Sequence, residues 1–165
     1  MERVLVIGSP GAGKSTLAGV LAKRTGLPLF HLDQLYWRPG WVEPDKATWA
    51  AEVSSLIAQP RWIIEGNYGG TLPLRLGRAD TVIHLDLPAP LCVIRVLKRV
   101  IRSWGRVRAD MAEGCPEHFN LEFLAYTASF PWKGRRRIEE KMKGFGGTYV
   151  RLHSRREIDA FRQSL

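Results

Sequence analysis

The stretch GSPGAGKS at residues 8–15 matches the phosphate-binding pattern G-x-x-x-x-G-K-[ST] at every fixed position. An apolar run, Val4 to Ile7, precedes it, and a segment with apolar residues at helical spacing, Lys14 to Arg24, follows it. Glycines let the backbone wrap around a phosphate with its N–H groups pointing inward, and the start of a helix adds partial positive charge. The stretch therefore predicts a phosphate-binding loop (P-loop) between a buried strand and a helix.

We expect this loop to bind a nucleoside triphosphate, with ATP and Mg²⁺ as the cofactors. Lys14 would reach the β and γ phosphates, and the hydroxyl of Ser15 would bind Mg²⁺. The nucleotide-binding residues predicted from the motif are Gly8, Ser9, Pro10, Gly11, Ala12, Gly13, Lys14, Ser15 and Thr16.

Short apolar runs and segments of helical periodicity alternate along the rest of the chain. We expect strands at 4–7, 29–32, 62–64, 81–87 and 148–152, and helices at 14–24, 44–58, 90–104, 119–130, 135–143 and from 154 onward. Strands that alternate with helices form a parallel sheet covered on both faces. The sequence thus predicts an α/β fold, a three-layer P-loop NTPase with a five-stranded parallel sheet.

Length and charge limit the remaining choices. The 165 residues are expected to form one domain, 1–165, with no bilayer-spanning stretch and no signal peptide. Two cysteines give no disulfide framework, so a cytoplasmic location is expected. The net charge of +9 suits a polyanionic ligand, either a nucleotide or nucleic acid. The oligomeric state stays open.

The size of the chain favours a small kinase among P-loop proteins. It leaves little room for the extra modules of motors or remodelling ATPases, and the base-specificity motifs of GTPases are absent. An arginine-rich segment before a glycine-rich loop is typical of a kinase that closes a lid to exclude water. The leading hypothesis is a phosphotransferase that moves the γ-phosphate of ATP to a small-molecule or nucleotide acceptor. The alternative is a nucleotide-gated regulator that binds nucleic acid, although no nucleic-acid-binding motif is present.

The chain resembles the adenylate-kinase-like P-loop kinases, and more closely the bacterial DNA topology modulation proteins. The stretches that carry this likeness are FHLDQLYWRPGW (30–41), WIIEGNYGGTLPLRL (62–76), ADTVIHLDLP (79–88) and RADMAEGC (108–115). The resemblance implies a nucleoside-monophosphate-kinase-like fold, ATP with Mg²⁺ as phosphate donor, an acceptor-binding segment at about 33–60 and a mobile lid at about 105–118. The name of that group reports an association with DNA supercoiling, which is not a biochemical activity.

Two departures from adenylate kinases bear on the acceptor. Gly13-Lys14-Ser15-Thr16 stands where they have Gly-Lys-Gly-Thr, and it is similar to shikimate-kinase-like and gluconate-kinase-like enzymes. Residues 65–68 read EGNY, without the arginine that holds the monophosphate in adenylate kinases. AMP is therefore not an assured acceptor.

Polar and aromatic residues after the second and third predicted strands are candidates for acceptor binding. Asp33 would orient an acceptor hydroxyl or hold Mg²⁺ through water, and Glu65 would bind metal-bound water or the acceptor. Each has a structural alternative, an aspartate that caps a turn and a glutamate that pairs with an arginine. The other candidates in this region are Tyr36, Trp37, Arg38 and Trp41. We expect at least one of the two tryptophans to pack the helix 44–58 against the sheet.

A run of basic residues without an acid extends through Arg95, Lys98, Arg99, Arg102, Arg106 and Arg108. Such a run is commonly a solvated helix face, but before a lid it also suits a bound triphosphate. By the resemblance to adenylate kinases, Arg99 would stack on the adenine, and Arg102 or Arg108 would contact phosphate.

Further polar residues have simpler interpretations. A structural role is favoured for Asp86 over a role near Mg²⁺, and His31 and His84 are expected to be satisfied core histidines. Surface positions are expected for Arg75 and Arg78. Cys115-Pro-Glu-His118 has the spacing of two zinc ligands, but a zinc site needs more ligands than these two.

Overall fold

A computed structural model describes residues 1–165 and contains five strands and eight helices. The strands are β1 (Arg3–Gly8), β2 (Leu29–His31), β3 (Trp62–Glu65), β4 (Thr81–Leu85) and β5 (Thr148–Leu152). The helices are α1 (Lys14–Thr25), α2 (Leu32–Tyr36), α3 (Lys46–Ile57), α4 (Leu72–Leu76), α5 (Ala89–Ser103), α6 (Leu121–Ser129), α7 (Gly134–Met142) and α8 (Arg155–Ser164).

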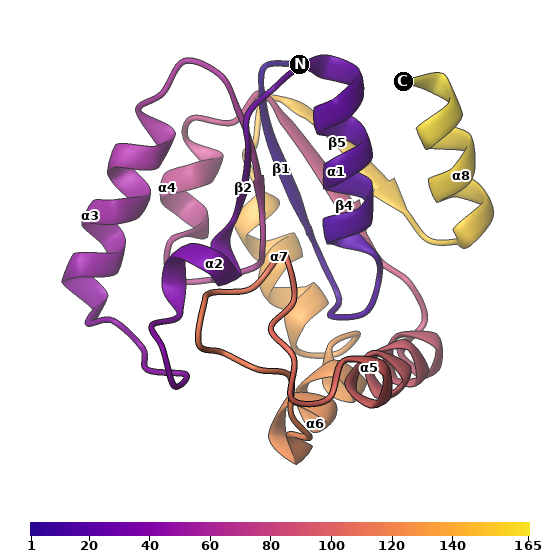
Figure 1. Ribbon diagram of the computed structural model, residues 1–165. Coiled ribbons are helices and arrows are strands. Elements are labelled where there is room, and N and C mark those ends of the chain that lie inside the picture. Colours follow the sequence, from indigo (N-terminus) through magenta and orange to yellow (C-terminus); the bar gives the residue numbers. More distant parts are fainter.

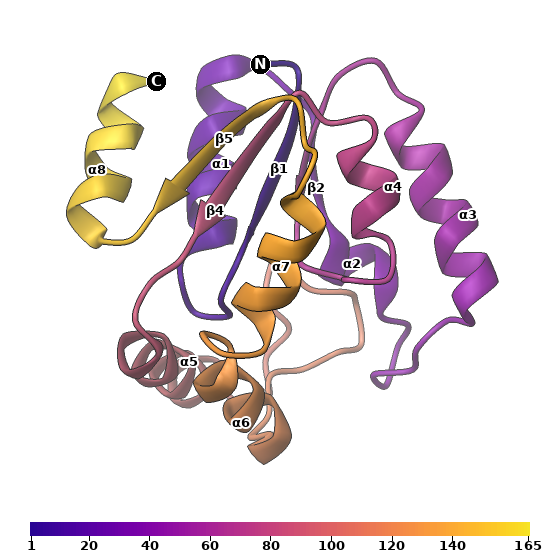
Figure 2. The same cartoon turned by 180° about the vertical axis from the view of Figure 1, so that it is seen from behind.

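The five strands form one parallel sheet in the order β2-β3-β1-β4-β5. Helices α1 and α8 cover one face of this sheet (Figure 1), and α3, α4 and α7 cover the other (Figure 2). The prediction of a three-layer α/β fold with a five-stranded parallel sheet is confirmed. Because β1 is central, the P-loop at its carboxyl end lies at the point where the strand order reverses. The crevice at this point is the usual ligand site of such sheets.

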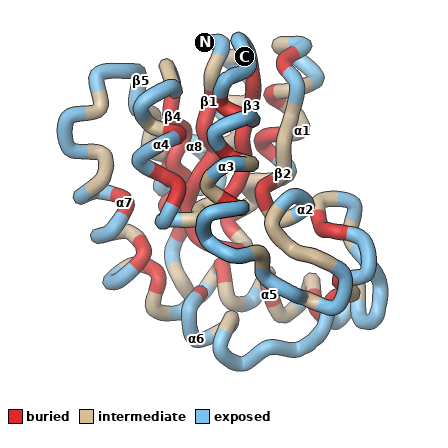
Figure 3. Tube along the Cα trace, turned by 90° about the vertical axis from the view of Figure 1, so that its left-hand side faces the viewer, coloured by how far each residue is buried: buried red, intermediate tan, exposed pale blue.

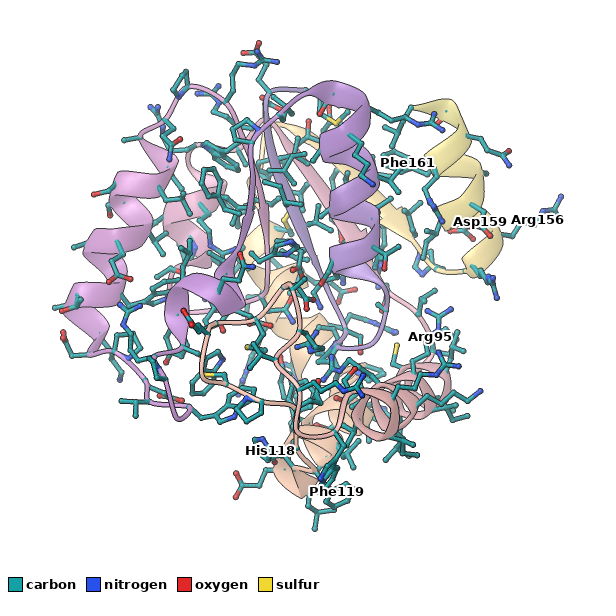
Figure 4. The ribbon with its side chains drawn as sticks, in the orientation of Figure 1. Arg95, His118, Phe119, Arg156, Asp159 and Phe161 are labelled. Carbon is teal, nitrogen blue, oxygen red and sulfur yellow. The ribbon has the colours of Figure 1, made fainter.

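Burial explains why these segments form a sheet. Residues 4–8 of β1 and every residue of β3 and β4 are buried, as expected for parallel strands covered on both faces (Figure 3). Alternate side chains of β1 enter different cores, with Val4 and Val6 packing against α1 while Leu5 and Ile7 pack toward α3 and α7. On α8, Phe161 points toward α1 and Arg156 points outward (Figure 4).

The element boundaries differ from the sequence prediction at two short helices. Leu32 starts α2 rather than ending a strand, and α4 follows a glycine pair where no helix was predicted. The predicted N-terminal cap of α8 is confirmed, since Ser154 Oγ accepts from the N–H of Glu157 at 3.2 Å. None of the helices combines the length and apolarity needed to cross a bilayer.

A polar cluster joins α7 to the edge of the sheet. Asp86, at the end of β4, accepts from Arg135 of α7 at 2.9 Å and from Arg151 of β5 at 2.7 Å. His84 on the same face lies 2.7 Å from the hydroxyl of Tyr149. The structural interpretation of Asp86 is therefore supported, because its carboxylate is occupied by two guanidinium groups.

This cluster makes the stability of the protein depend on pH. Burial lowers the pKa of His84 from 6.5 to about 4, and the attraction of Asp86 offsets this only in part. Between these two pH values the folded protein binds fewer protons than the unfolded chain. His84 therefore does not lower the free energy of unfolding above pH 6.5, and it lowers it increasingly as the pH falls toward 4. We expect wild type to lose about 3 kcal/mol more unfolding free energy than His84→Gln between pH 6.5 and 4. Urea unfolding at both pH values measures this difference, and equal losses in the two proteins would contradict it.

Candidate active site

The P-loop is held in place by a side chain from the next strand of the sheet. Asn67, just after β3, accepts from the N–H of Gly8 at 2.9 Å and donates to the carbonyl of Gly8 at 2.8 Å. Gly8 has φ 136°, and a Cβ there would lie 2.1 Å from the carbonyl oxygen of Leu85. Only glycine fits between β1 and β4 at this turn. Lys14 extends over the loop and donates to the carbonyl of Ser9 at 3.1 Å.

The hydroxyl of Ser15 points at the carboxyl end of β3. It donates to Glu65 at 3.2 Å, and the same carboxylate oxygen lies 2.9 Å from Nδ1 of His31. The hydrogen bond to Glu65 raises the pKa of His31 despite partial burial. Burial opposes ionisation of Asp110, but Arg108 and the hydroxyl of Ser15 outweigh it and hold the pKa of Asp110 below its usual value. Serine and carboxylate oxygens from three segments thus converge at the mouth of the P-loop.

These oxygens fit a Mg²⁺ ion that is bound together with a nucleotide. Mg²⁺ prefers oxygen ligands, and it is usually held by one or two carboxylates together with substrate phosphates and water. No group of three or more His, Cys, Asp or Glu side chains is arranged as a metal cage, and this type of site does not require one. Ser15 with Glu65 supplies the protein's share of such a site.

Asp33 follows the second strand and is held by a tyrosine. The hydroxyl of Tyr68 donates to it at 2.6 Å. Burial raises the pKa of Asp33, and the hydrogen bond from Tyr68 opposes this rise. Burial and the nearby carboxylate also raise the pKa of Tyr68. A half-buried carboxylate of this kind can accept a proton from a hydroxyl or orient it.

Arg75 of α4 holds the loop that carries Asn67 and Tyr68 through hydrogen bonds to its backbone. This guanidinium is fully buried and donates to the carbonyls of Gly66, Asn67 and Tyr68. Burial lowers the pKa of Arg75 to about 9. The predicted surface position of Arg75 is wrong, because three backbone carbonyls solvate its charge inside the protein, whereas Arg78 is exposed as predicted.

Arg75→Met should destabilise the protein by about 2–4 kcal/mol, since the three buried carbonyls would lose their donor. Arg78→Met, at an exposed position three residues before β4, is the matched control and should stay within about 0.5 kcal/mol of wild type. Chemical denaturation of the three proteins measures both values. A change in Arg75→Met no larger than in the control would contradict the structural role.

Strained backbone occurs at the walls of the site. Trp41 has φ 64° and Tyr68 has φ 34°, and these are the two residues other than glycine with positive φ. Such conformations cost free energy and persist where the surrounding structure fixes them, often at functional sites. Both residues line the cavity described below.

The lid carries its own pairs of opposite charges. Glu117 binds Arg99 of α5 at 3.0 Å and Arg108 at 2.8 Å, and Arg108 also binds Asp110 at 2.8 Å. Burial and the neighbouring Arg108 lower the pKa of Arg99. Arg95 lies on the side of α5 that faces the P-loop (Figure 4), and it donates to the carbonyl of Ala12 at 3.4 Å. Arg99 and Arg108 are thus paired with acids that a triphosphate could replace.

The lid also contacts the predicted acceptor segment directly. The N–H of Gly40 donates to the carbonyl of Gly114 at 2.9 Å, and Trp41 Nε1 donates to the carbonyl of Pro116 at 3.2 Å. Residues Met111, Ala112 and Cys115 form a small core with Trp37 and Trp41. The expectation that one of these tryptophans packs α3 is wrong; Tyr36 contacts Trp49 of α3 instead, with ring centroids 5.0 Å apart.

All of these parts open onto one cavity of about 940 Å³. The P-loop contributes Lys14, Ser15 and Thr16 to its lining, and the acceptor segment contributes Asp33, Trp37, Trp41 and Glu43. Glu65 and Tyr68 follow from the third strand, and Arg95, Arg99, Arg108 and Asp110 from α5 and the lid. Asn120, Phe123 and Tyr126 enter from α6 and the residue before it. The volume is in the range of small-molecule and cofactor sites.

The structure does not place every predicted residue in this cavity. Arg102 is exposed and outside the lining; it lies on the same face of α5 as Arg95 and Arg99 but nearer the carboxyl end of the helix. Arg38 also lies outside the lining and pairs with Glu52 of α3 at 2.5 Å. Tyr36 packs in the aromatic core behind the cavity. The assignment of these three residues to the site is therefore corrected.

Most of the predicted P-loop residues do line the cavity. Pro10, Gly11, Gly13, Lys14, Ser15 and Thr16 line the cavity, whereas Gly8, Ser9 and Ala12 shape the loop behind it. The sequence analysis missed Arg95 as an individual site residue, and it missed Asn67, Tyr68, Asp110 and Glu117. Asn67 and Tyr68 lie in the stretch EGNYGG, at the end of a predicted strand. Asp110 and Glu117 lie in the stretch RADMAEGCPEH, at the end of the basic run.

Comparisons with known proteins agree with this architecture. No protein-family profile and no curated protein sequence matches the chain. The solved structure of a presumed kinase from Chloroflexus aurantiacus is similar over 99% of this chain and 97% of that one, with 18% identity and a TM-score of 0.55. Shikimate kinase from Acinetobacter baumannii, solved in complex with shikimate, is similar over 99% and 90% of the two chains, with 16% identity and a TM-score of 0.62.

The likeness to both proteins extends over almost the whole chain and concerns the fold. The protein therefore has the fold of the P-loop kinases, with a five-stranded parallel sheet as in shikimate kinase. Its site combines that fold with a complete P-loop and with residues of the predicted lid, 105–118, that line the same cavity.

Proposed function

We propose that the protein is an ATP-dependent phosphotransferase that moves the γ-phosphate of ATP to a hydroxyl of a small acceptor. The observation that carries this proposal is the single cavity into which Lys14, Asp33 and Arg108 all open. A hydrolase needs only the phosphate-binding half of such a cavity. A kinase needs a second half that holds an acceptor and a lid that excludes water.

The chain's own residues have separable roles in this reaction. Lys14 and the backbone N–H groups of the P-loop bind and orient the β and γ phosphates. Asp33, fixed by Tyr68, accepts the proton of the acceptor hydroxyl or holds that hydroxyl in line with the γ-phosphate. Arg99 and Arg108 leave their ion pairs with Glu117 and bind the transferring phosphoryl group instead, where they stabilise its negative charge.

Ser15 and Glu65 would hold Mg²⁺, which when bound would neutralise charge on the phosphates. Glu65 already accepts from Ser15, so the serine hydroxyl is oriented toward that position before a nucleotide binds. Arg95, against the P-loop backbone, is a further candidate for contact with the nucleotide, in addition to Arg99.

Within the P-loop kinases, we place the chain with the adenylate-kinase-like enzymes, closest to the DNA topology modulation proteins. The stretches that carry this resemblance include Asp33, Glu65 and Asp110, which line the cavity. A direct role with DNA is not part of the proposed reaction. A gel shift that persists at physiological salt would favour the alternative, a nucleic-acid-binding regulator.

The first experiment is a thermal-shift titration with ATP and Mg²⁺. At 100 times its dissociation constant a ligand adds about 2.7 kcal/mol to the stability of the folded protein. We expect the midpoint to rise with ATP and Mg²⁺ in wild type and not in Lys14→Ala. A lack of any shift in wild type would remove the basis of the proposed function.

A further inference from the structure

The charges that line the cavity are unevenly distributed between its two halves. Four cationic side chains line it, and all of them belong to the P-loop, α5 or the lid: Lys14, Arg95, Arg99 and Arg108. The acceptor segment contributes two carboxylates and two indoles, from Asp33, Glu43, Trp37 and Trp41, and no cation. Arg38, which belongs to the same segment, pairs with Glu52 outside the lining.

The carboxylates of the two halves also differ in their partners. Glu117 and Asp110 are paired with Arg99 and Arg108, as described above. Asp33 and Glu43 have no ion-pair partner in the structure, and the one hydrogen bond to the Asp33 carboxylate comes from the neutral Tyr68. On the nucleotide side Arg99 and Arg108 are therefore paired with acids, whereas Asp33 and Glu43 form no ion pair, and Lys14 and Arg108 act on Asp33 only by longer-range attraction.

The tryptophans next to these acids form an aromatic corner. The ring centroids of Trp37 and Trp41 are 5.3 Å apart, and the ring planes meet at 70°. The strained backbone of Trp41 and its bond to Pro116 hold one wall of this corner in place. Indole faces beside a carboxylate attract an ammonium group, because the ring face carries negative electrostatic potential. An anionic acceptor would instead meet Asp33 and Glu43 on a wall that contributes no cation of its own.

We propose that the acceptor is a hydroxylated amine, a compound that carries an alcohol and a protonated amino group and no phosphate or carboxylate. This inference rests on the proposed phosphotransferase function and specifies its substrate class. The hydroxyl lies at Asp33, facing the P-loop, and the ammonium group lies between Glu43 and the indoles of Trp37 and Trp41. In the transfer, the hydroxyl oxygen bonds to the γ-phosphorus, the bond to the β–γ bridging oxygen breaks, and the hydroxyl proton passes to Asp33; ADP leaves.

The test compares acceptors that share a ring and differ in charge. Glucosamine, glucose and glucuronate serve as the cationic, neutral and anionic probes, and adenosine with AMP as a second neutral and anionic pair. Aminocyclitols and amino alcohols extend the set of amines. Phosphorylated product is measured by mass spectrometry with ATP and Mg²⁺. We expect kcat/KM for amines to exceed that of the neutral analogue by about tenfold, and anionic members to be poorer still.

Substitutions at Glu43 test the placement of the amino group. Glu43→Gln should reduce the preference for amine over neutral analogue about tenfold, mainly through KM, and Glu43→Lys should shift the preference toward glucuronate. Glu52→Gln, which removes a carboxylate from the same segment outside the cavity, is the matched control and should keep the preference for amines.

Three outcomes overturn the inference. They are equal or better phosphorylation of glucuronate or AMP, a neutral analogue preferred over its amine, and no phosphorylation of any amine. Loss of an anionic activity in Arg137→Ala would trace it to the adjoining cavity of about 360 Å³, which contains Arg137 and Lys141. The proposed function fails separately, if ATP binding does not depend on Lys14 or if no compound of any charge is phosphorylated.

Discussion

Lys14→Ala should reduce transfer of phosphate from ATP by about a hundredfold to a thousandfold while the protein stays folded. The lysine is the one cation in the P-loop that can reach the β and γ phosphates, and a single preorganised donor to transition-state charge is worth about 10²–10³ in rate. Its contact in the structure is a bond to the carbonyl of Ser9, and that carbonyl also accepts from the N–H of Ala12 at 3.2 Å. Loss of the ammonium group therefore leaves the loop hydrogen-bonded.

Steady-state kinetics and thermal unfolding of the same preparation measure this prediction. Lys23→Ala removes an exposed lysine from the same helix and is the control for net charge. We expect wild-type activity in the control and an unfolding midpoint close to wild type in both variants. Activity in Lys14→Ala within tenfold of wild type would show that the P-loop does not bind the reacting phosphates.

Asp33→Asn should lower kcat by at least about a hundredfold and leave the protein as stable as wild type or more stable. General-base and orienting carboxylates contribute about 10²–10⁴ to the rate. The raised pKa of Asp33 means that folding disfavours its ionised form, so a neutral side chain of the same shape removes a cost at pH 7. The hydroxyl of Tyr68 can donate to an asparagine oxygen as it does to the carboxylate.

The combination of lost activity with retained stability separates a catalytic from a structural role. Asp159→Asn, on the outer side of α8, changes the same charge far from the cavity and is the control. ATP affinity should be similar in all three proteins, because Asp33 belongs to the acceptor half. A stable Asp33→Asn variant with full kcat would exclude the carboxylate from the chemistry, and a strong loss of stability would indicate a structural role.

The sequence allowed prediction of features that depend on local pattern. The P-loop, the strands around it and the capping box of α8 each depend on neighbouring residues, so short stretches contain the signal. The positions of Asp33 and Glu65 followed from the rule that the carboxyl ends of parallel strands meet at one edge of the sheet.

The features that could not be predicted depend on which surfaces meet in three dimensions. Arg75 has no acidic partner, and its burial depends on three carbonyls of a loop whose shape the sequence does not reveal. The basic run from Arg95 to Arg108 contains no acid, but Glu117 folds back onto Arg99 of α5, and Asp110 pairs with Arg108 in the loop after that helix. Arg102 shares the run with Arg99 and, at a spacing of three residues, the same face of α5, but it lies nearer the end of the helix and is exposed, so periodicity alone does not separate the two arginines.

The central claim is that one cavity binds ATP and an acceptor hydroxyl together. The most direct measurement follows ATP labelled at the γ-phosphate, with Mg²⁺ and a panel of acceptors of different charge, in wild type and Lys14→Ala. The account predicts a labelled acceptor in wild type, little label in inorganic phosphate, and neither product in the variant. Label that enters only inorganic phosphate, whatever acceptor is supplied, would contradict it.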